Sequence, residues 1–254
     1  RVPQDGRFKI KVGGRQYALR VSTLPIVDGE EVVMRILDES NQAVTLEQLG
    51  YWGRALTDIS REMNEPDGIV LMTGPTGSGK STSLFSILTM LNKPNVNMST
   101  IEDPVEFLFK NKKSVINQRE IGSDTKSLQV ALKNALRQAP DVILIGEIRD
   151  RETMSAAIAY AQSGHLCLAT MHANNSYQAL NRILSFYPVE VRPTMLGDLA
   201  AALKSVVSQR LLRNTAGTRV PAIEVLLNTK LISELIEKGD FSGVKDAMEQ
   251  SMAD

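Results

Sequence analysis

Eight consecutive residues have the composition of a phosphate-binding loop. Residues 74–81 read Gly-Pro-Thr-Gly-Ser-Gly-Lys-Ser, after an apolar run typical of a strand and before a run typical of an amphipathic helix. Glycines let successive backbone N–H groups turn toward phosphate oxygens, and the N-terminus of the helix favours an anion. We therefore expect ATP to bind through the loop and the start of the helix, at Gly74, Pro75, Thr76, Gly77, Ser78, Gly79, Lys80, Ser81 and Thr82.

Hydrolysis also requires Mg²⁺ and a group that activates water. In such a loop Lys80 reaches the β- and γ-phosphates, and the Ser81 hydroxyl is placed to bind the metal ion. Residues 141–147 read Asp-Val-Ile-Leu-Ile-Gly-Glu, which predicts an apolar strand that ends in a carboxylate. Glu147 would then lie at the carboxyl end of that strand, near the phosphates and Mg²⁺.

A second acidic group follows another predicted strand. Glu102, Asp103 and Glu106 lie within five residues of one another. One of them would activate the attacking water, and the spacing alone does not say which. A charged turn is the alternative interpretation.

Two histidines, His165 and His172, flank a third predicted strand. Their spacing is equally compatible with structural histidines and with a sensor of the γ-phosphate. Cys167, in the same apolar strand, is the only cysteine. We expect a buried, unreactive thiol, and a single cysteine excludes a disulfide framework or a four-cysteine zinc site within one chain.

Composition narrows the classes of protein. The 29 basic and 29 acidic residues give no net charge, which argues against a general nucleic-acid binder. No apolar stretch approaches the roughly 20 residues of a membrane span, and no signal peptide is evident, so a cytoplasmic protein is expected. The opening residues, Arg-Val-Pro-Gln-Asp-Gly, predict a start within a longer protein.

Residue periodicity changes along the chain. Strand-like alternation over 7–37 predicts a sheet-rich domain at 1–38, followed by a polar linker at 39–45. From Leu46, six apolar residues (46, 49, 52, 56, 59 and 63) recur at helical spacing. Strands at 69–72, 97–101, 115–118, 142–145 and 166–170 then alternate with helices at 80–92, 126–138, 151–162 and 176–185, which predicts a mainly parallel α/β sheet. From about 191 we expect mostly helices, with one strand-like piece at 220–227.

The motifs, in this order and at this spacing, resemble the secretion and type IV pilus motor ATPases over nearly the whole chain. Four segments carry the resemblance: Gly74–Ser81, Ile101–Phe107, Gly146–Asp150 and Ser163–His172. The resemblance implies a RecA-like P-loop ATPase core at 46–254, a small PAS-like α+β domain before it and C-terminal helices. It also implies a homo-hexamer that hydrolyses ATP.

The same resemblance implies roles for individual residues. Glu106 takes the position of the general base, Ser81 and Glu147 serve Mg²⁺, and His165 and His172 sense phosphate.

In the sheet-rich domain, Arg20 and Arg35 match arginines that this family sends toward a neighbouring subunit's nucleotide. An arginine supplied in this way stabilises transition-state charge and makes hydrolysis depend on assembly.

Different parts of the chain resemble different branches of the family. About the first hundred residues resemble extension and secretion ATPases, whereas the chain from about Lys110 resembles retraction ATPases. The four-cysteine module typical of the former is absent between Arg213 and Pro221. Retraction-type members of the family also continue beyond the position that corresponds to Asp254, so a C-terminal truncation is expected.

We therefore expect a pilus retraction motor at the cytoplasmic face of the inner membrane. It would act on an inner-membrane platform protein, with a paralogous motor as a further expected partner. A pilus extension or type II secretion ATPase is the close alternative. An ATP-binding regulatory paralogue and a DNA translocase are the more distant ones, and no nucleic-acid partner is expected.

Overall fold

The computed structural model describes residues 2–38, 44–109, 111 and 113–251. The chain divides into two compact units, Arg1–Ala43 with Glu106–Phe109 and Val44–Val105 with Lys110–Asp254. Within the described ranges, no helix combines the length and the apolar character needed to cross a membrane. The predicted linker at 39–45 lies mostly outside the described residues, so that boundary stays a prediction.

The first unit contains a three-stranded antiparallel sheet in the order β1-β2-β3. Its strands are β1 (Gln4–Val12), β2 (Arg15–Ile26) and β3 (Gly29–Asp38). Gly13 and Gly14 join β1 to β2 with φ of +58° and +82°. Two successive positive φ angles make the tight turn that suits antiparallel strands, and glycine adopts them without strain. The described residues of this unit supply the sheet of the predicted α+β domain and contain no helix.

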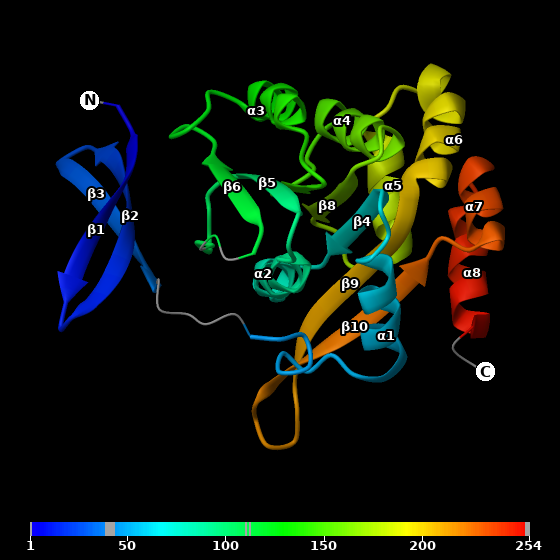
Figure 1. The fold of residues 1–254 in the computed structure, drawn as a ribbon, viewed down its shortest axis with the longest axis horizontal. Helices are drawn as coiled ribbons and strands as arrows, with labels where there is room; N and C mark the ends of the chain where they lie inside the picture. Colours follow the sequence, from blue (N-terminus) through cyan, green and yellow to red (C-terminus); the bar gives the residue numbers. More distant parts are fainter. Residues whose placement is uncertain (1, 39–43, 110, 112, 252–254) are drawn as a thin grey trace. The chain divides into compact units, whose positions relative to one another are not determined.

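The second unit is built on a seven-stranded sheet in the order β10-β9-β4-β8-β7-β5-β6 (Figure 1). Neighbouring strands from β9 to β6 run parallel, and β10 pairs with β9 antiparallel. The predicted α/β core is therefore confirmed. The strands are β4 (Gly68–Thr73), β5 (Asn97–Glu102), β6 (Val115–Glu120), β7 (Val142–Ile145), β8 (Leu166–Met171), β9 (Leu203–Arg213) and β10 (Arg219–Leu227).

Helices cover both faces of this sheet. The helices are α1 (Gly53–Glu62), α2 (Lys80–Leu91), α3 (Leu128–Ala135), α4 (Arg151–Gln162), α5 (Ser176–Ser185), α6 (Arg192–Ala202), α7 (Lys230–Glu237) and α8 (Phe241–Ser251). The largest core cluster joins Ile69 and Leu71 of β4 to residues of α3 through α8. Val70 and Met72 are fully buried outside that cluster, as are residues of α1 and α2. Because strand side chains alternate between faces, α1 and α2 cover the opposite face.

The prediction of a mostly helical region after residue 191 was wrong for β9. This strand lies between β4 and β10, and its residues Leu203, Val206 and Val207 are almost fully buried. A strand buried on both faces loses the alternation by which strands are found in sequence. The alanines that end α6 also favour a helix, so they conceal the boundary at Leu203.

The helix expected from Leu46 begins later, at Gly53. Gly50 and Gly53 have φ of +96° and +59°, which an α-helix does not accommodate, and the preceding residues form turns. As a consequence, Trp52 is 81% exposed at the helix start, although its spacing predicted the apolar face. Tyr51, 1% exposed, occupies the interior instead.

Candidate active site

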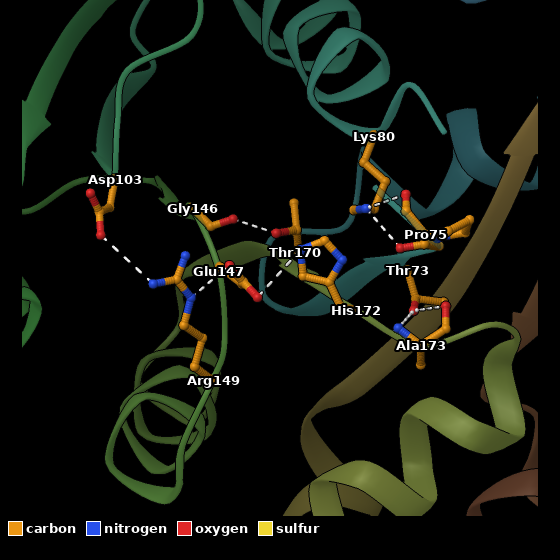
Figure 2. Close-up of polar contacts among 11 residues, drawn as sticks. Thr73, Pro75, Lys80, Asp103, Gly146, Glu147, Arg149, Thr170, His172 and Ala173 are labelled. Carbon is orange, nitrogen blue, oxygen red and sulfur yellow. Dashed lines mark hydrogen bonds and ion pairs between the residues drawn. The ribbon is translucent and has the colours of Figure 1, made fainter. Parts of the chain in front are cut away.

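The parallel sheet brings the predicted motifs together at its carboxyl edge, the edge formed by the carboxyl ends of its strands. Strands β4, β8, β7 and β5 are successive neighbours, so their carboxyl ends lie side by side. The phosphate loop follows β4, His172 follows β8, Glu147 follows β7 and Asp103 follows β5. Figure 2 shows Glu147 and His172 between Asp103 on one side and Lys80 with Pro75 on the other. This edge is where open α/β sheets bind ligands.

The phosphate loop is fixed at its first glycine. Gly74 has a φ of +147°, and a Cβ added there would lie 2.2 Å from the backbone oxygen of Gln209. Only glycine fits so close an approach. Lys80, 8% exposed, donates hydrogen bonds from Nζ to the carbonyl oxygens of Gly74 (2.7 Å) and Pro75 (3.0 Å) (Figure 2). The ammonium group is therefore held over the loop.

The N-terminus of α2 differs from those of most other helices in this unit. Side chains at the N-caps of α3, α4, α5 and α7 accept a hydrogen bond from the first turn; these caps are Ser127, Asp150, Asn175 and Thr229. At α2 the N-cap is Gly79, which offers no side chain. The first N–H groups of a helix need partners from outside it. At α2 a phosphate would supply them, so the loop fits a nucleotide.

Glu147 lies at the centre of an ion-pair network. Its Oε2 atom is 2.7 Å from Nε of Arg149, and its Oε1 atom is 3.5 Å from Nε2 of His172. Arg149 also reaches Asp103, with Nη1 3.7 Å from Oδ2 (Figure 2). None of the sequence predictions assigns a separate role to Arg149, although it stands two residues after Glu147 in the same motif. The network holds the Glu147 carboxylate at the sheet edge.

Backbone packing also fixes Glu147. A Cβ on the preceding residue, Gly146, would lie 3.1 Å from the Cα of Glu102 and the carbonyl oxygen of Ile101. The hydroxyl of Thr170, on β8, donates to the Gly146 carbonyl. β7 is thus clamped on both sides just before Glu147.

The two histidines lie at opposite ends of β8, His165 at the edge formed by the amino ends of the strands and His172 at the carboxyl edge. His172 follows the carboxyl end of β8 and contacts Glu147. His165 precedes β8, and its carbonyl accepts a hydrogen bond from the N–H of Gly68, the first residue of β4. The six-residue strand between them spans about 20 Å. Within the chain, His172 is brought to the loop and His165 is not.

The contacts of His165 are structural. Its Nδ1 atom lies 3.1 Å from the carbonyl oxygen of Tyr160, and the two rings make an edge contact at 6.3 Å. Its predicted phosphate-sensing role stays a prediction that these contacts do not support.

The three acids of the second acidic group have different surroundings. Glu102 accepts hydrogen bonds from Thr100 Oγ1 (2.7 Å) and Gln118 Nε2 (3.3 Å), and Asp103 pairs with Arg149. Glu106 is exposed and belongs to the first unit. Its role as general base therefore stays a prediction.

In the first unit, the register of the sheet aligns three arginines. Arg20 on β2 lies opposite Arg7 on β1 and opposite Arg35 on β3. Directly opposite residues of antiparallel strands share a face, and like charges in such positions destabilise the sheet. The sequence singled out Arg20 and Arg35 but gave Arg7 no role.

Two hollows flank the phosphate loop in the second unit. The smaller, about 320 Å³, is lined by Gly74, Pro75, His172, Ala173, Asn174, Gln178 and Arg182. The larger, about 640 Å³, is lined by Pro75, Thr76, Gly77, Ser78, Asn174, Arg210, Leu211, Leu212, Arg213 and Arg219. Ligand pockets commonly have such volumes. Their four arginines were not predicted as site residues, because the hairpin that carries three of them was read as mostly helical.

The side chains that could bind a metal ion near the loop, Ser81 and Glu147, suit Mg²⁺ that is also held by a nucleotide better than a metal ion that is held by protein side chains alone. In the described part of the chain, no three His, Cys, Asp or Glu side chains gather as metal ligands. Mg²⁺ is typically held by one or two carboxylates together with substrate phosphates and water. Ser81 and Glu147 match that requirement once a nucleotide is present.

Burial explains why Cys167 plays no part in this chemistry. The residue is fully buried in β8, and burial raises the pKa of its thiol to about 12. The expectation of a buried thiol is confirmed.

Comparisons with known proteins agree with this geometry. The chain is 49% identical over 186 residues to the type IV pilus ATPase PilU of Pseudomonas aeruginosa, covering 72% of this chain and 49% of that protein. It is 41% identical over 210 residues to the type II secretion system protein E of the same organism, covering 82% of this chain and 41% of that protein. The chain thus spans about half the length of these relatives, or less.

A solved structure gives the same relationship. The crystal structure of the pilus retraction motor PilT with bound ADP matches with a TM-score of 0.86 and 35% identity, covering 98% of this chain and 70% of that one. The family model of the Type II/IV secretion system proteins matches residues 1–238. The resemblance seen in the motifs is confirmed: the chain belongs to the Type II/IV secretion system protein family.

Proposed function

We propose that this chain binds ATP with Mg²⁺ and hydrolyses it, as part of a motor for a type IV pilus or a type II secretion machine. One observation carries the proposal. The loop with its lysine, the helix N-terminus without a side-chain cap, and the Glu147–His172 pair lie at one edge of one sheet. The relatives named as pilus ATPases support the same reading.

Each group has a role that follows from its charge and position. Lys80 and the N–H groups of the loop would bind phosphate oxygens, and Ser81 and Glu147 would hold Mg²⁺. When bound, the metal ion neutralises charge on the phosphates. His172 lines the same hollow as Gly74, which supports a role in which it donates a hydrogen bond to the terminal phosphate.

Nucleotide binding and turnover of the unmodified chain test this proposal. We expect ADP and ATP to bind, ATP to be hydrolysed, and Lys80→Ala to abolish turnover. Lys204→Ala, which removes a lysine at the opposite edge of the sheet, is the matched control. Equal turnover in the unmodified chain and Lys80→Ala would contradict the proposal.

We further propose that the site is completed in a homo-hexamer by arginines of a neighbouring subunit. The register of the sheet supports this idea, because it places Arg20 and Arg35, the two arginines that the family resemblance singles out, directly opposite each other on one face. An arginine supplied in trans typically contributes about 10³–10⁵ in rate. Glu106 is the proposed general base.

A mixing experiment tests completion by a neighbour. One chain would carry Lys80→Ala, and the other Arg20→Ala with Arg35→Ala. Each alone should be inactive, whereas the mixture should recover turnover where an intact loop meets intact arginines. A mixture as inactive as its components would exclude supply in trans.

We propose that the motor is of the retraction type, acting on an inner-membrane platform protein at the cytoplasmic face, with a paralogous motor as a further partner. The 49% identity to PilU and the TM-score of 0.86 to the PilT structure support this branch. The identities to the pilus assembly ATPase PilB of Myxococcus xanthus (43%) and to a type II secretion protein (41%) exceed that to PilT (39%), so an extension motor and a secretion motor stay the second candidates. Deletion in the source organism separates them: surface pili that no longer retract indicate retraction, and loss of pili or of secretion indicates the alternative.

A further inference from the structure

Gln209 is a buried polar residue next to the phosphate loop, and none of the sequence predictions assigns it a role. It lies on β9, which pairs in parallel with β4 and places Ser208 opposite Thr73. Gln209 is therefore level with Gly74, where the loop begins. Its side chain is 3% exposed. A buried amide must use its hydrogen-bonding atoms, or it destabilises the fold.

Both ends of the Gln209 amide are used. Nε2 donates to the carbonyl oxygen of Ser78, in the middle of the loop, at 2.8 Å. Oε1 accepts from the hydroxyl of Ser83 on α2 at 2.8 Å and from that of Tyr51 at 2.5 Å. One side chain thus connects the loop, the helix behind it and the segment that precedes α1.

The Ser78 carbonyl determines which way the amide faces, because a carbonyl oxygen can only accept and the NH₂ group must therefore be the end that meets it. An amide can be turned end for end, and only the neighbouring donors and acceptors distinguish its oxygen from its nitrogen. Burial raises the pKa of Tyr51 to about 12, so its hydroxyl keeps its proton and stays a donor. With Tyr51 and Ser83 both at the oxygen, the NH₂ group is directed at the Ser78 carbonyl.

The direction of that carbonyl has a consequence for the ligand. The Ser78–Gly79 peptide bond is trans, so the Ser78 carbonyl and the Gly79 N–H point in opposite directions. Because Gln209 holds the carbonyl on the side of the loop that faces its own side chain, the Gly79 N–H turns to the opposite side. That side is where a phosphate oxygen would accept from it.

We propose that Gln209 is a positioning residue for the nucleotide: held by Tyr51 and Ser83, it turns the Ser78–Gly79 peptide so that the N–H faces the phosphates. This inference rests on the proposed nucleotide site and adds a residue outside its motifs. It predicts that the loop is shaped before the ligand arrives, which lowers the cost of binding.

The test compares two replacements of Gln209. Gln209→Glu keeps the shape but loses the NH₂ donor, and Gln209→Met keeps the approximate volume but loses both polar ends. The readouts are the dissociation constant of a fluorescent ADP analogue, and KM and kcat for ATP. We expect both variants to raise the dissociation constant and KM at least tenfold, with kcat changed less than threefold.

The donors provide variants that leave Gln209 in place. Tyr51→Phe combined with Ser83→Ala frees the amide to turn and should weaken binding about fivefold. Ser86→Ala is the matched control, because Ser86 is on the same helix, is 2% exposed, and its hydroxyl has no hydrogen-bond partner among the described residues. It should bind as the unmodified chain does.

The outcomes separate this inference from the proposed function. If the unmodified chain binds no nucleotide, the proposed function fails. If it binds, and the Gln209→Met and Tyr51→Phe/Ser83→Ala variants bind within twofold of it, the positioning role fails. If Gln209→Met does not fold, the Tyr51→Phe/Ser83→Ala variant decides alone.

Discussion

The two edges of the seven-stranded sheet carry similar residues with different surroundings. Each has a histidine next to β8, and each has one cation between two carboxylates. At the carboxyl edge, Arg149 contacts Glu147 and Asp103. At the amino edge, Lys204 lies 3.6 Å from Glu65 and 3.5 Å from Asp67.

The difference between the edges is the phosphate loop. The carboxyl edge has two hollows and a helix N-terminus without a side-chain cap. At the amino edge, the side chain of Lys204 packs on Gly68, whose added Cβ would lie 2.4 Å from it. Similar residue types therefore surround the proposed nucleotide site at one edge and contribute to packing at the other.

The largest effect is expected from Glu147. Glu147→Gln removes the charge that would hold Mg²⁺, and turnover should fall about a hundredfold, as for other groups that stabilise transition-state charge. Steady-state ATP hydrolysis measures it. Glu65→Gln removes a carboxylate from the amino edge and should leave turnover within twofold. Equal losses in the two variants would erase the distinction between the edges.

A smaller effect is expected from the cations. Arg149→Met frees Glu147 from its 2.7 Å ion pair and should lower turnover about tenfold, roughly 1.4 kcal/mol of barrier. Lys204→Met breaks pairs that are partly exposed, which are typically worth about 0–1 kcal/mol of stability. Its turnover should not change. Retained activity in Arg149→Met would show that the network is not needed.

The histidines compare the edges most directly. His172→Ala should lower ATP turnover about tenfold while changing ADP affinity less than threefold, because its proposed contact is with the terminal phosphate, which ADP lacks. His165→Ala should leave nucleotide affinity within twofold and lower the free energy of unfolding by about 1 kcal/mol, through the lost contact with Tyr160. Steady-state ATP hydrolysis measures the turnover, ligand titration the nucleotide affinity, and urea unfolding the free energy of unfolding. Loss of nucleotide affinity in His165→Ala would place that residue in the site.

The smallest effect concerns Cys167, inside the strand that joins the edges. Because the pKa of its thiol is raised to about 12, it stays protonated and unreactive in the folded chain from neutral pH to well above 8. A thiol reagent should label it only after opening, and ADP should slow the labelling by the factor 1 + [ADP]/Kd. Fast labelling of the native chain, insensitive to ADP, would contradict this account.

Much of the fold could be predicted because local signals agree with tertiary contacts. The helix at 151–162 and the helix at 176–185 have the predicted bounds, since Asp150 and Asn175 cap them and mark their starts. The strand at 142–145 was also predicted correctly. For each of these elements, the residues that determine its bounds lie within the element or directly next to it in the sequence.

The missed features depend on contacts between distant segments. Gln209 and Tyr51 are 158 residues apart, and no local pattern indicates that they share a hydrogen bond. The register that aligns Arg7 with Arg20 follows from pairing, which the composition does not reveal. His165 and His172 look equivalent in sequence, and only the direction of β8 separates them.

The most direct measurement uses the fact that these are the only two histidines in the chain. The imidazole resonances of a histidine-labelled sample, assigned with the two single alanine variants, would be followed as ADP and Mg²⁺ are added. The account predicts that the resonances of His172 shift with saturation and that those of His165 stay in place. Shifts confined to His165, or shifts at neither residue when nucleotide is bound, would contradict it.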